Sequence, residues 1–260
     1  MPMKLFYSPI SDVVQKSLVV ADELGLTQGI DEVAVYPRKH GYSIAAINPL
    51  AKVPTLALED GRVLFGSQTI VEYFDSISVN GKRVYPASGP DRWDALTRLA
   101  LADILFDIVV RIGQERLVDP PGEHIVQWNW PKLMRGLDHM ERGVSSEGRF
   151  DIGDISTLQA LTYFERQVAI GIPGPVQQNF NWREGHPQLS GWFEKALQRP
   201  SVADRYKKPF AGNDSPEACQ RHVSEVLRLQ GIATDDTQIE LPAVDFVAPR
   251  TASEDLSARH

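Results

Sequence analysis

The chain has 260 residues, of which 42% are hydrophobic and 23% are charged, the balance of a protein that folds around an apolar core. Its formal net charge of −7, with no concentration of basic residues along the sequence, argues against nucleic acid as its main partner. No apolar run is long enough to cross a bilayer and the first residues lack the features of a secretory signal, so we expect a cytoplasmic protein that does not enter a membrane.

The first residues have the pattern of a strand, a helix and a second strand. Residues 4–7 form a short apolar run that a Ser-Pro pair interrupts, and apolar residues then recur near helical spacing between residues 11 and 24. Gly25 ends this predicted helix, and Val-Ala-Val at residues 33–35 predicts the second strand. The order is that of a βαβ unit.

A hairpin and another helix follow in the sequence. Two short apolar runs, residues 55–58 and 62–65, flank an Asp-Gly turn, which is a strong local signal for a β-hairpin. Ser67 is the expected N-cap of a helix that continues to about Asp75. The elements of this region therefore come in the order β-α-β and then β-β-α.

The rest of the chain is predicted to be mainly helical. Residues 76–90 are rich in Ser, Asn, Gly and Pro, which predicts a linker, and a second domain is expected to begin near Asp91. One more helix is expected over residues 215–229, and the acidic but partly apolar residues that follow it are expected to pack in part. Between these two points, apolar residues three to four positions apart predict helices over residues 91–116, 123–143, 154–170 and 187–198.

A motif in the first domain resembles a known family. Asn-Pro-Leu-Ala-Lys-Val-Pro-Thr-Leu at residues 48–56 precedes the hairpin, and Ser-Gln-Thr-Ile-Val-Glu-Tyr at residues 67–73 follows it. Together they resemble the N-terminal half of cytosolic glutathione S-transferases, of the bacterial type with serine at the catalytic position. Asp-Ile-Gly-Asp at residues 151–154 is similar to that family's helix-capping box. The resemblance covers about residues 3–210.

The resemblance implies a fold and an assembly. It implies an α/β thioredoxin-like domain that binds glutathione on a mixed four-stranded sheet, at residues 1–80, and an all-α bundle domain at residues 91–210. Residues 211–260 are then a C-terminal extension. The resemblance also implies a homodimer that uses glutathione as its co-substrate.

Glutathione would be held by the backbone and by a helix N-terminus. The family resemblance implies a cis bond before Pro54, which would let Val53 present its N–H and C=O to a peptide-like ligand. From the residues alone, an ordinary trans proline at the start of a strand is the alternative. Ser67 would help to bind the γ-glutamyl carboxylate, because the N–H groups and the dipole of a helix N-terminus favour an anion.

Basic residues near the motif could bind the glycyl carboxylate of glutathione. Lys52 is the main candidate, and Lys39 or His40 could join it from the preceding loop, although a solvated basic loop is the alternative for these two residues. His40 has no second ligand at a useful spacing, so no metal site is expected.

The ammonium group of glutathione lacks its usual partner in this sequence. Members of the family commonly carry an acidic or amide residue just before the serine, whereas this chain has Gly66. Asp103 and Asp107 lie one turn apart in an apolar helix, and in some relatives an acid on this helix reaches the ammonium across the dimer. The alternative is a pair of solvated carboxylates at the edge of the interface.

The residue at the start of the first helix decides the chemistry in this family, and here that residue is Ser11. A serine hydroxyl that donates a hydrogen bond to the thiol would enlarge the thiolate fraction of glutathione, whose sulfur then attacks an electrophilic carbon. Spacing alone makes Ser11 a plain N-cap, and Ser8 competes for the catalytic role. Asp12 suits the helix dipole but would oppose a neighbouring thiolate. Cys219 is the only cysteine, which excludes an internal disulfide and a CxxC redox pair.

Two functions remain open. The first is a transferase that conjugates glutathione to a small electrophilic or hydrophobic molecule, or a related lyase, isomerase or dehalogenase. The second is a non-catalytic binding or interaction protein on the same scaffold, which Gly66 and Asp12 favour, whereas Ser11, the motif and the lack of a basic face favour the first. An acceptor pocket is expected between the domains, to which the C-terminal extension could contribute. Its candidate lining residues, which could equally be core, are Phe106, Val110, Trp128, Trp130 and Phe210.

Overall fold

Four strands form one mixed sheet in the computed structural model, which describes residues 2–8, 11–35, 44–115, 123–144, 148–170, 180–206 and 216–232. The strands are β1 (Met3–Tyr7), β2 (Ile30–Ala34), β3 (Thr55–Ala57) and β4 (Val63–Phe65), in the spatial order β2-β1-β3-β4. β1 runs parallel to β2 and antiparallel to β3, and β3 pairs antiparallel with β4 across the predicted hairpin. The predicted thioredoxin-like fold class is confirmed.

Helices cover one face of this sheet. The helix α1 (Asp12–Glu23) and the short 3-10 helix η1 (Thr27–Gly29) make the crossover that a parallel strand pair requires, and α3 (Ser67–Ser76) follows the hairpin. Alternate residues of β1 point to opposite faces, so Leu5 belongs to the core under α1 and α3 whereas Phe6 belongs to a separate cluster on the other face. Both faces of the sheet are therefore buried.

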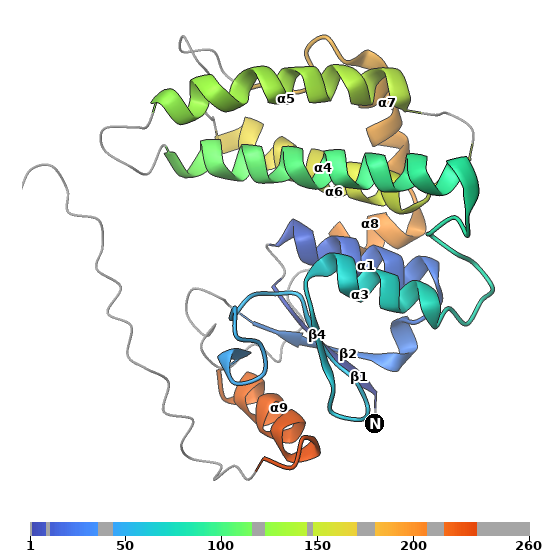
Figure 1. Ribbon diagram of the computed structural model, residues 1–260, viewed down its shortest axis with the longest axis vertical. Coiled ribbons are helices and arrows are strands. Elements are labelled where there is room, and N and C mark those ends of the chain that lie inside the picture. The colour runs from blue at the N-terminus through green and yellow to red at the C-terminus, as the bar shows by residue number, and fades with distance from the viewer. Residues whose placement is uncertain are drawn as a thin grey trace, which may run out of the picture.

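A helical domain stacks on α1 and α3, on the side away from the sheet (Figure 1). Its helices are α4 (Gly89–Glu115), α5 (Glu123–Gly143), α6 (Ile152–Ile170), α7 (Pro187–Ala196) and α8 (Pro200–Tyr206). The first four match the predicted segments to within two residues at each end, whereas α8 was not predicted because a seven-residue helix shows little periodicity. Among the helices that the structure describes, none is long and apolar enough to cross a membrane.

The C-terminal helix α9 (Pro216–Leu229) packs on the outer face of the sheet, opposite α1 and α3 (Figure 1). Val223 and Val226 join Phe6 in the second apolar cluster, and Nζ of Lys4 lies 3.2 Å from Oε2 of Glu225. The helix predicted over residues 215–229 is thus present. The expectation that the extension lines an acceptor pocket is wrong for α9. This helix packs on the apolar outer face of the sheet, on the side opposite the helical domain.

Candidate functional site

Ser11 stands at the N-terminus of α1 without using its side chain as a cap. Its backbone is extended, with φ −103° and ψ 112°, and its carbonyl accepts a hydrogen bond from the N–H of Val14 at 3.1 Å, yet its hydroxyl makes no capping hydrogen bond. The residue is half-exposed, whereas the competing Ser8 is only 1% exposed and its Oγ has no hydrogen-bond partner. Of the two serines, Ser11 is the one that a ligand at the surface can reach.

The N-terminus of α3 differs from the prediction in one respect. Ser67 was expected to cap this helix, but Ser67 is its first helical residue and Gly66 is the N-cap. The prediction was wrong because the chain turns from β4 into α3 with φ 86° at residue 66, a conformation that glycine adopts most readily. Gly66 has no side chain, so α3 begins with no side-chain cap and its first N–H groups have no intrahelical partner.

The loop before β3 presents Val53 at the same edge of the sheet as the start of α3. The Val53-Pro54 bond is cis, as predicted, and Val53 is half-buried. β3 follows directly and pairs with β4, the strand that ends at Phe65 just before Gly66, with Thr55 opposite Phe65. The pairing therefore brings the two parts of the motif together.

Two residues that lock this loop were not singled out from the sequence. Asn48 is 1% exposed, and its Nδ2 donates hydrogen bonds to the carbonyl of Lys52 at 2.9 Å and to Oγ1 of Thr55 at 2.8 Å. Thr55 in turn donates to the same Lys52 carbonyl at 2.8 Å. The side chain of Lys52 remains exposed. The Asn-Pro pair that begins the motif was the available signal, but the partners of the buried Asn48 are visible only in the fold. Lys39 and His40 lie outside the described residues.

Asp103 lies against a buried lysine of α1. Nζ of Lys16 lies 2.8 Å from Oδ1 of Asp103, the Lys16 side chain is 1% exposed and that of Asp103 is 33% exposed. Burial lowers the pKa of Lys16, and the negative charges of Asp103 and Asp107 oppose that shift. The structure therefore brings the predicted ammonium-binding acid into an ion pair within its own chain. Lys16 was missed, although a lysine between apolar residues of a predicted helix was a visible signal.

Asp12 also has a partner in the helical domain. Its carboxylate is 3% exposed and accepts a hydrogen bond from Nη2 of Arg166 on α6. The guanidinium of Arg166 lies 5.8 Å from the ring centroid of Tyr163, whose ring is 4.7 Å from that of Phe106 on α4. Arg166 was not identified from the sequence. The positive charge of Arg166 pairs with the carboxylate of Asp12, whose negative charge was expected to oppose a nearby thiolate.

The other candidate lining residues fall in different places. Trp130 packs edge-on against Phe180 at 6.0 Å, so it belongs to the packed interior of the helical domain. Trp128 is 72% exposed, with the ammonium of Lys132 4.4 Å from its ring centroid. Val110 is half-buried, and Phe210 lies outside the described residues. Among the candidate lining residues, Phe106 is the one connected to the start of α1. It contacts Tyr163, which contacts Arg166, the partner of Asp12.

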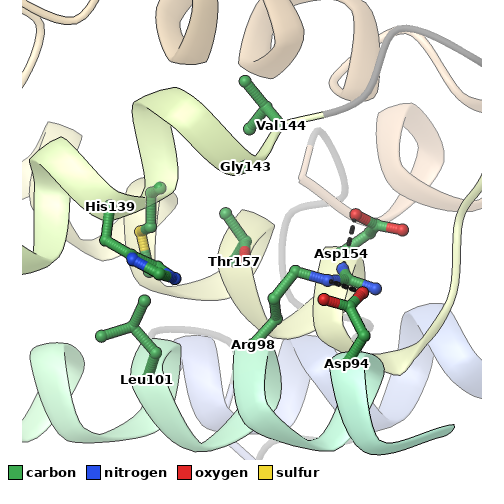
Figure 2. A pocket seen from close by; sticks show the side chains of 9 residues that line it. Asp94, Arg98, Leu101, His139, Gly143, Val144, Asp154 and Thr157 are labelled. Atoms are coloured by element: carbon green, nitrogen blue, oxygen red, sulfur yellow. Dashed lines mark hydrogen bonds and ion pairs between the residues drawn. The ribbon is translucent and has the colours of Figure 1, made fainter. Parts of the chain in front are cut away.

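A small cavity of about 70 Å³ lies elsewhere, between α4, α5 and α6 (Figure 2). Figure 2 shows Arg98 between Asp94 and Asp154, with His139 and Leu101 at the opposite side. Every nitrogen of the Arg98 guanidinium is bonded, since Nε, Nη1 and Nη2 donate to Asp94, Asp154 and Asp151 at 2.9, 2.8 and 2.7 Å. The cavity therefore offers no unsatisfied guanidinium to a ligand.

The carboxylates beside this cavity form the predicted capping box. The N–H of Asp151 donates to Oδ2 of Asp154 at 3.1 Å, and the N–H of Gly153 donates to Oδ1 of Asp151 at 2.9 Å. Burial, followed by the charge of Asp151, raises the pKa of Asp154. This cluster fixes the start of α6 on α4 and contains none of the predicted site residues. Within the described part of the chain, no group of three or more His, Cys, Asp or Glu side chains is placed to hold a metal ion.

Comparisons with known proteins agree with this architecture. Residues 10–77 match the model of the family described as glutathione S-transferase, N-terminal domain. The chain is 28% identical to the uncharacterized GST-like protein YibF of Escherichia coli K12, over 77% of this chain and 96% of that protein.

Solved structures are also similar to this chain. A glutathione transferase family member from Pseudomonas fluorescens Pf-5 with bound glutathione is 30% identical, with a TM-score of 0.70, over 80% of this chain and all of that one. A glutathione S-transferase from Methylobacillus flagellatus KT with glutathione bound is 27% identical, with a TM-score of 0.68, over 78% of this chain and 98% of that one. The uncovered remainder corresponds in size to the C-terminal extension.

Proposed function

Since this chain belongs to the glutathione transferase family, we propose that it binds glutathione beside Val53 and Ser67 and that Ser11 activates the thiol for attack on a small electrophile. The observation that carries the proposal is the hydroxyl of Ser11, which stands half-exposed at the N-terminus of α1 and makes no capping hydrogen bond. A hydroxyl that is not used to cap the helix can donate to a sulfur atom placed there. The glutathione held by the two similar solved structures supports the choice of ligand.

The ligand contacts follow from the geometry of the loop and of α3. The backbone of Val53 would pair with the peptide-like backbone of glutathione, and the uncapped N–H groups at the start of α3, with Ser67, would hold the γ-glutamyl carboxylate. The exposed Lys52 would pair with the glycyl carboxylate. Asp103 is the acid offered to the ammonium, and it would have to bind this group together with Lys16.

The chemical step removes the thiol proton and moves two electron pairs, one that forms a bond to sulfur and one that leaves the reacting carbon. The thiol proton leaves to solvent while the Ser11 hydroxyl and the N-terminus of α1 stabilise the thiolate. A sulfur lone pair then forms the S–C bond to the electrophile. In a substitution, the leaving group departs with its bonding electrons; in an addition, the π electrons move to a neighbouring atom of the electrophile, which takes up a proton from solvent. The half-buried rings of Phe106 and Tyr163 offer an apolar wall for that acceptor.

We also propose that two copies of the chain associate. Leu50, Phe65 and Ile104, which lie before β3, on β4 and on α4, are 62%, 40% and 58% exposed. Exposed apolar side chains of this size are typical of an interface when they form one patch. Light scattering coupled to gel filtration should give the mass of a dimer, and Ile104→Asp should reduce it to that of a monomer.

The alternative is a protein that binds glutathione or another ligand without turnover. Two observations favour it: Gly66 offers no side chain to the ammonium group, and Lys16 already occupies Asp103. The two functions give different results in one set of measurements. Calorimetric titration with reduced glutathione reports binding, and a conjugation assay with an aromatic electrophile reports turnover.

Ser11→Ala and Ser8→Ala form a matched pair for this test. With Ser11 as the activating group, Ser11→Ala should keep glutathione binding and lose about 100-fold in turnover, the usual effect of removing one donor to a developing anion. Ser8→Ala should leave turnover close to that of the wild type. Turnover that is lost only in Ser8→Ala would move the catalytic role to Ser8, and no turnover in the wild type despite binding would support the binding protein.

A further inference from the structure

Asp12 places a buried negative charge next to the proposed thiol site. It is the first residue of α1, directly after Ser11, and its side chain is only 3% exposed. A carboxylate in the first turn is favourable for the helix itself because of the helix dipole. The same charge disfavours a thiolate at the same helix end, because two like charges within a few ångströms oppose each other's ionisation.

Arg166 compensates this charge from the other domain. Its Nη2 donates to Oδ2 of Asp12, and its side chain, at 42% exposed, lies at the boundary between the buried pair and solvent. Arg166 stands on α6, 154 positions away in the chain, so the pair exists only when the two domains are docked. A guanidinium stays charged at all working pH values, so the compensation is permanent in the folded protein.

The other charged groups near α1 are arranged in pairs of their own. Lys16, one turn beyond Asp12, is held by Asp103 of α4, and the charge of Asp107 also acts on Lys16. Glu23 at the far end of α1 accepts hydrogen bonds from Arg199 and Ser201, and Asp75 of α3 accepts from the N–H groups of Val84 and Tyr85. Among the described residues, Asp12 and Arg166 are thus the charged pair that contacts the first turn of α1.

We propose that Arg166 is a positioning residue that keeps the N-terminus of α1 able to stabilise the glutathione thiolate, by neutralising Asp12. This inference rests on the proposed function, and it assigns to α6 a part in the chemistry that Ser11 performs on α1. Arg166 does not contact the sulfur. Without its charge, the ionised Asp12 would oppose the thiolate and raise the pKa of the bound thiol.

The proposal predicts the apparent pKa of the bound thiol in four variants relative to the wild type. Arg166→Gln should raise the apparent pKa of bound glutathione by about 1 unit or more, and Asp12→Asn should lower it, because each removes one charge of the pair. The double variant removes both charges and should return close to the wild type. Arg166→Lys, which keeps the positive charge, should lie nearer to the wild type than Arg166→Gln.

The measurement is the ultraviolet absorbance of the thiolate in the glutathione complex, titrated against pH. Arg183→Gln is the matched control, because Arg183 pairs with Glu165 and Glu194 on α6 and α7 and should leave the titration unchanged. A purely structural role of Arg166 would lower the melting temperature without producing the opposite shifts of the two single variants. If Arg166→Gln does not fold, Asp12→Asn should still lower the apparent pKa of bound glutathione, and the double variant should still return it close to that of the wild type.

Two failures can be told apart. If the wild type binds no glutathione in calorimetry, the proposed function fails and this inference fails with it. If the wild type binds glutathione and Ser11→Ala shifts its thiol titration, but Arg166→Gln and Asp12→Asn do not, the proposed function stands and the role of Arg166 is overturned.

Discussion

Nζ of Lys16 lies 2.8 Å from Oδ1 and 3.0 Å from Oδ2 of Asp103, so one buried ammonium holds both oxygens of a carboxylate on the other domain. The contact joins α1, whose N-cap is the proposed catalytic serine, to α4. It also places the charge of Lys16 in the domain interface, where Asp103 is the acid that pairs with it directly. The first two predictions test this pair.

Asp103→Asn should destabilise the protein more than the equivalent change one turn later. Removing one partner of a buried ion pair leaves the other charge uncompensated, which typically costs about 3 kcal/mol in the free energy of unfolding. Asp107 is exposed, so Asp107→Asn should change that free energy by less than about 0.5 kcal/mol. Urea denaturation of both variants gives the comparison, and equal losses would show that the pair with Lys16 contributes little.

The burial of Lys16 should appear in the alkaline pH dependence of stability. The pKa of Lys16 is lowered from its ordinary value of 10.5, so near that pH the folded state binds fewer protons than the unfolded state. The stability contribution of this residue should therefore increase as the pH rises toward 10.5. The difference in unfolding free energy between the wild type and Lys16→Met, measured by denaturation at several alkaline pH values, should shift in favour of the wild type. A difference that is constant with pH would contradict the prediction.

Gly61→Ala should loosen α9 from the sheet. A Cβ atom at Gly61 would lie 2.9 Å from Cβ of Leu229, and residue 61 has φ +84°. The close contact and the strained backbone together should cost about 2 to 3 kcal/mol of unfolding free energy. Gly81→Ala is the control, because residue 81 has φ +73° with nothing within 4 Å of its added Cβ, so it carries the backbone strain alone. Thermal melting should therefore show a larger loss for Gly61→Ala.

Cys219 should report the opening of α9. Its thiol is 1% exposed, and burial raises its pKa to about 11, so it should react slowly with a thiol reagent at neutral pH. Gly61→Ala should accelerate the labelling, whereas Gly81→Ala should not, because only the first substitution presses on Leu229. The labelling rate in concentrated urea gives the upper limit for an open thiol. Rapid labelling of the native wild type would contradict the packing of α9.

Gly66→Asp should strengthen glutathione binding at the expense of stability. The new carboxylate would stand before Ser67, where it can pair with the ammonium group, and a Cβ there meets nothing within 4 Å. The backbone at φ 86° makes any L residue strained, which should cost about 1 to 2 kcal/mol. Gly66→Ala carries the same strain without the charge. Calorimetry should show tighter binding for the aspartate variant than for the alanine variant, and equal affinities would exclude residue 66 as a site for the ammonium.

Local patterns predicted the elements, and the resemblance of the motif to a known family predicted the fold and part of the site. The hairpin around Gly61, the capping box at residues 151–154 and the helix starting at Ser67 each depend on residues that are close in sequence. The exception is the N-cap of α3, where a φ of 86° assigns the position to Gly66. Apolar periodicity predicted the helices because it records which face of a helix is buried.

Periodicity does not show which residues lie against the buried face of a helix. Those partners were decided by the tertiary structure. Lys16 and Asp103 are 87 positions apart and Asp12 and Arg166 are 154 apart, so neither pair has a signal in a single sequence. The same holds for α9, whose sequence predicts an amphipathic helix but not the sheet face that it covers. The sequence by itself determined the elements, the motif at residues 48–56 and the serine at the start of α1. The docking of the two domains decided which charges surround that serine, because a buried charge is stable only beside the partner that the fold brings to it.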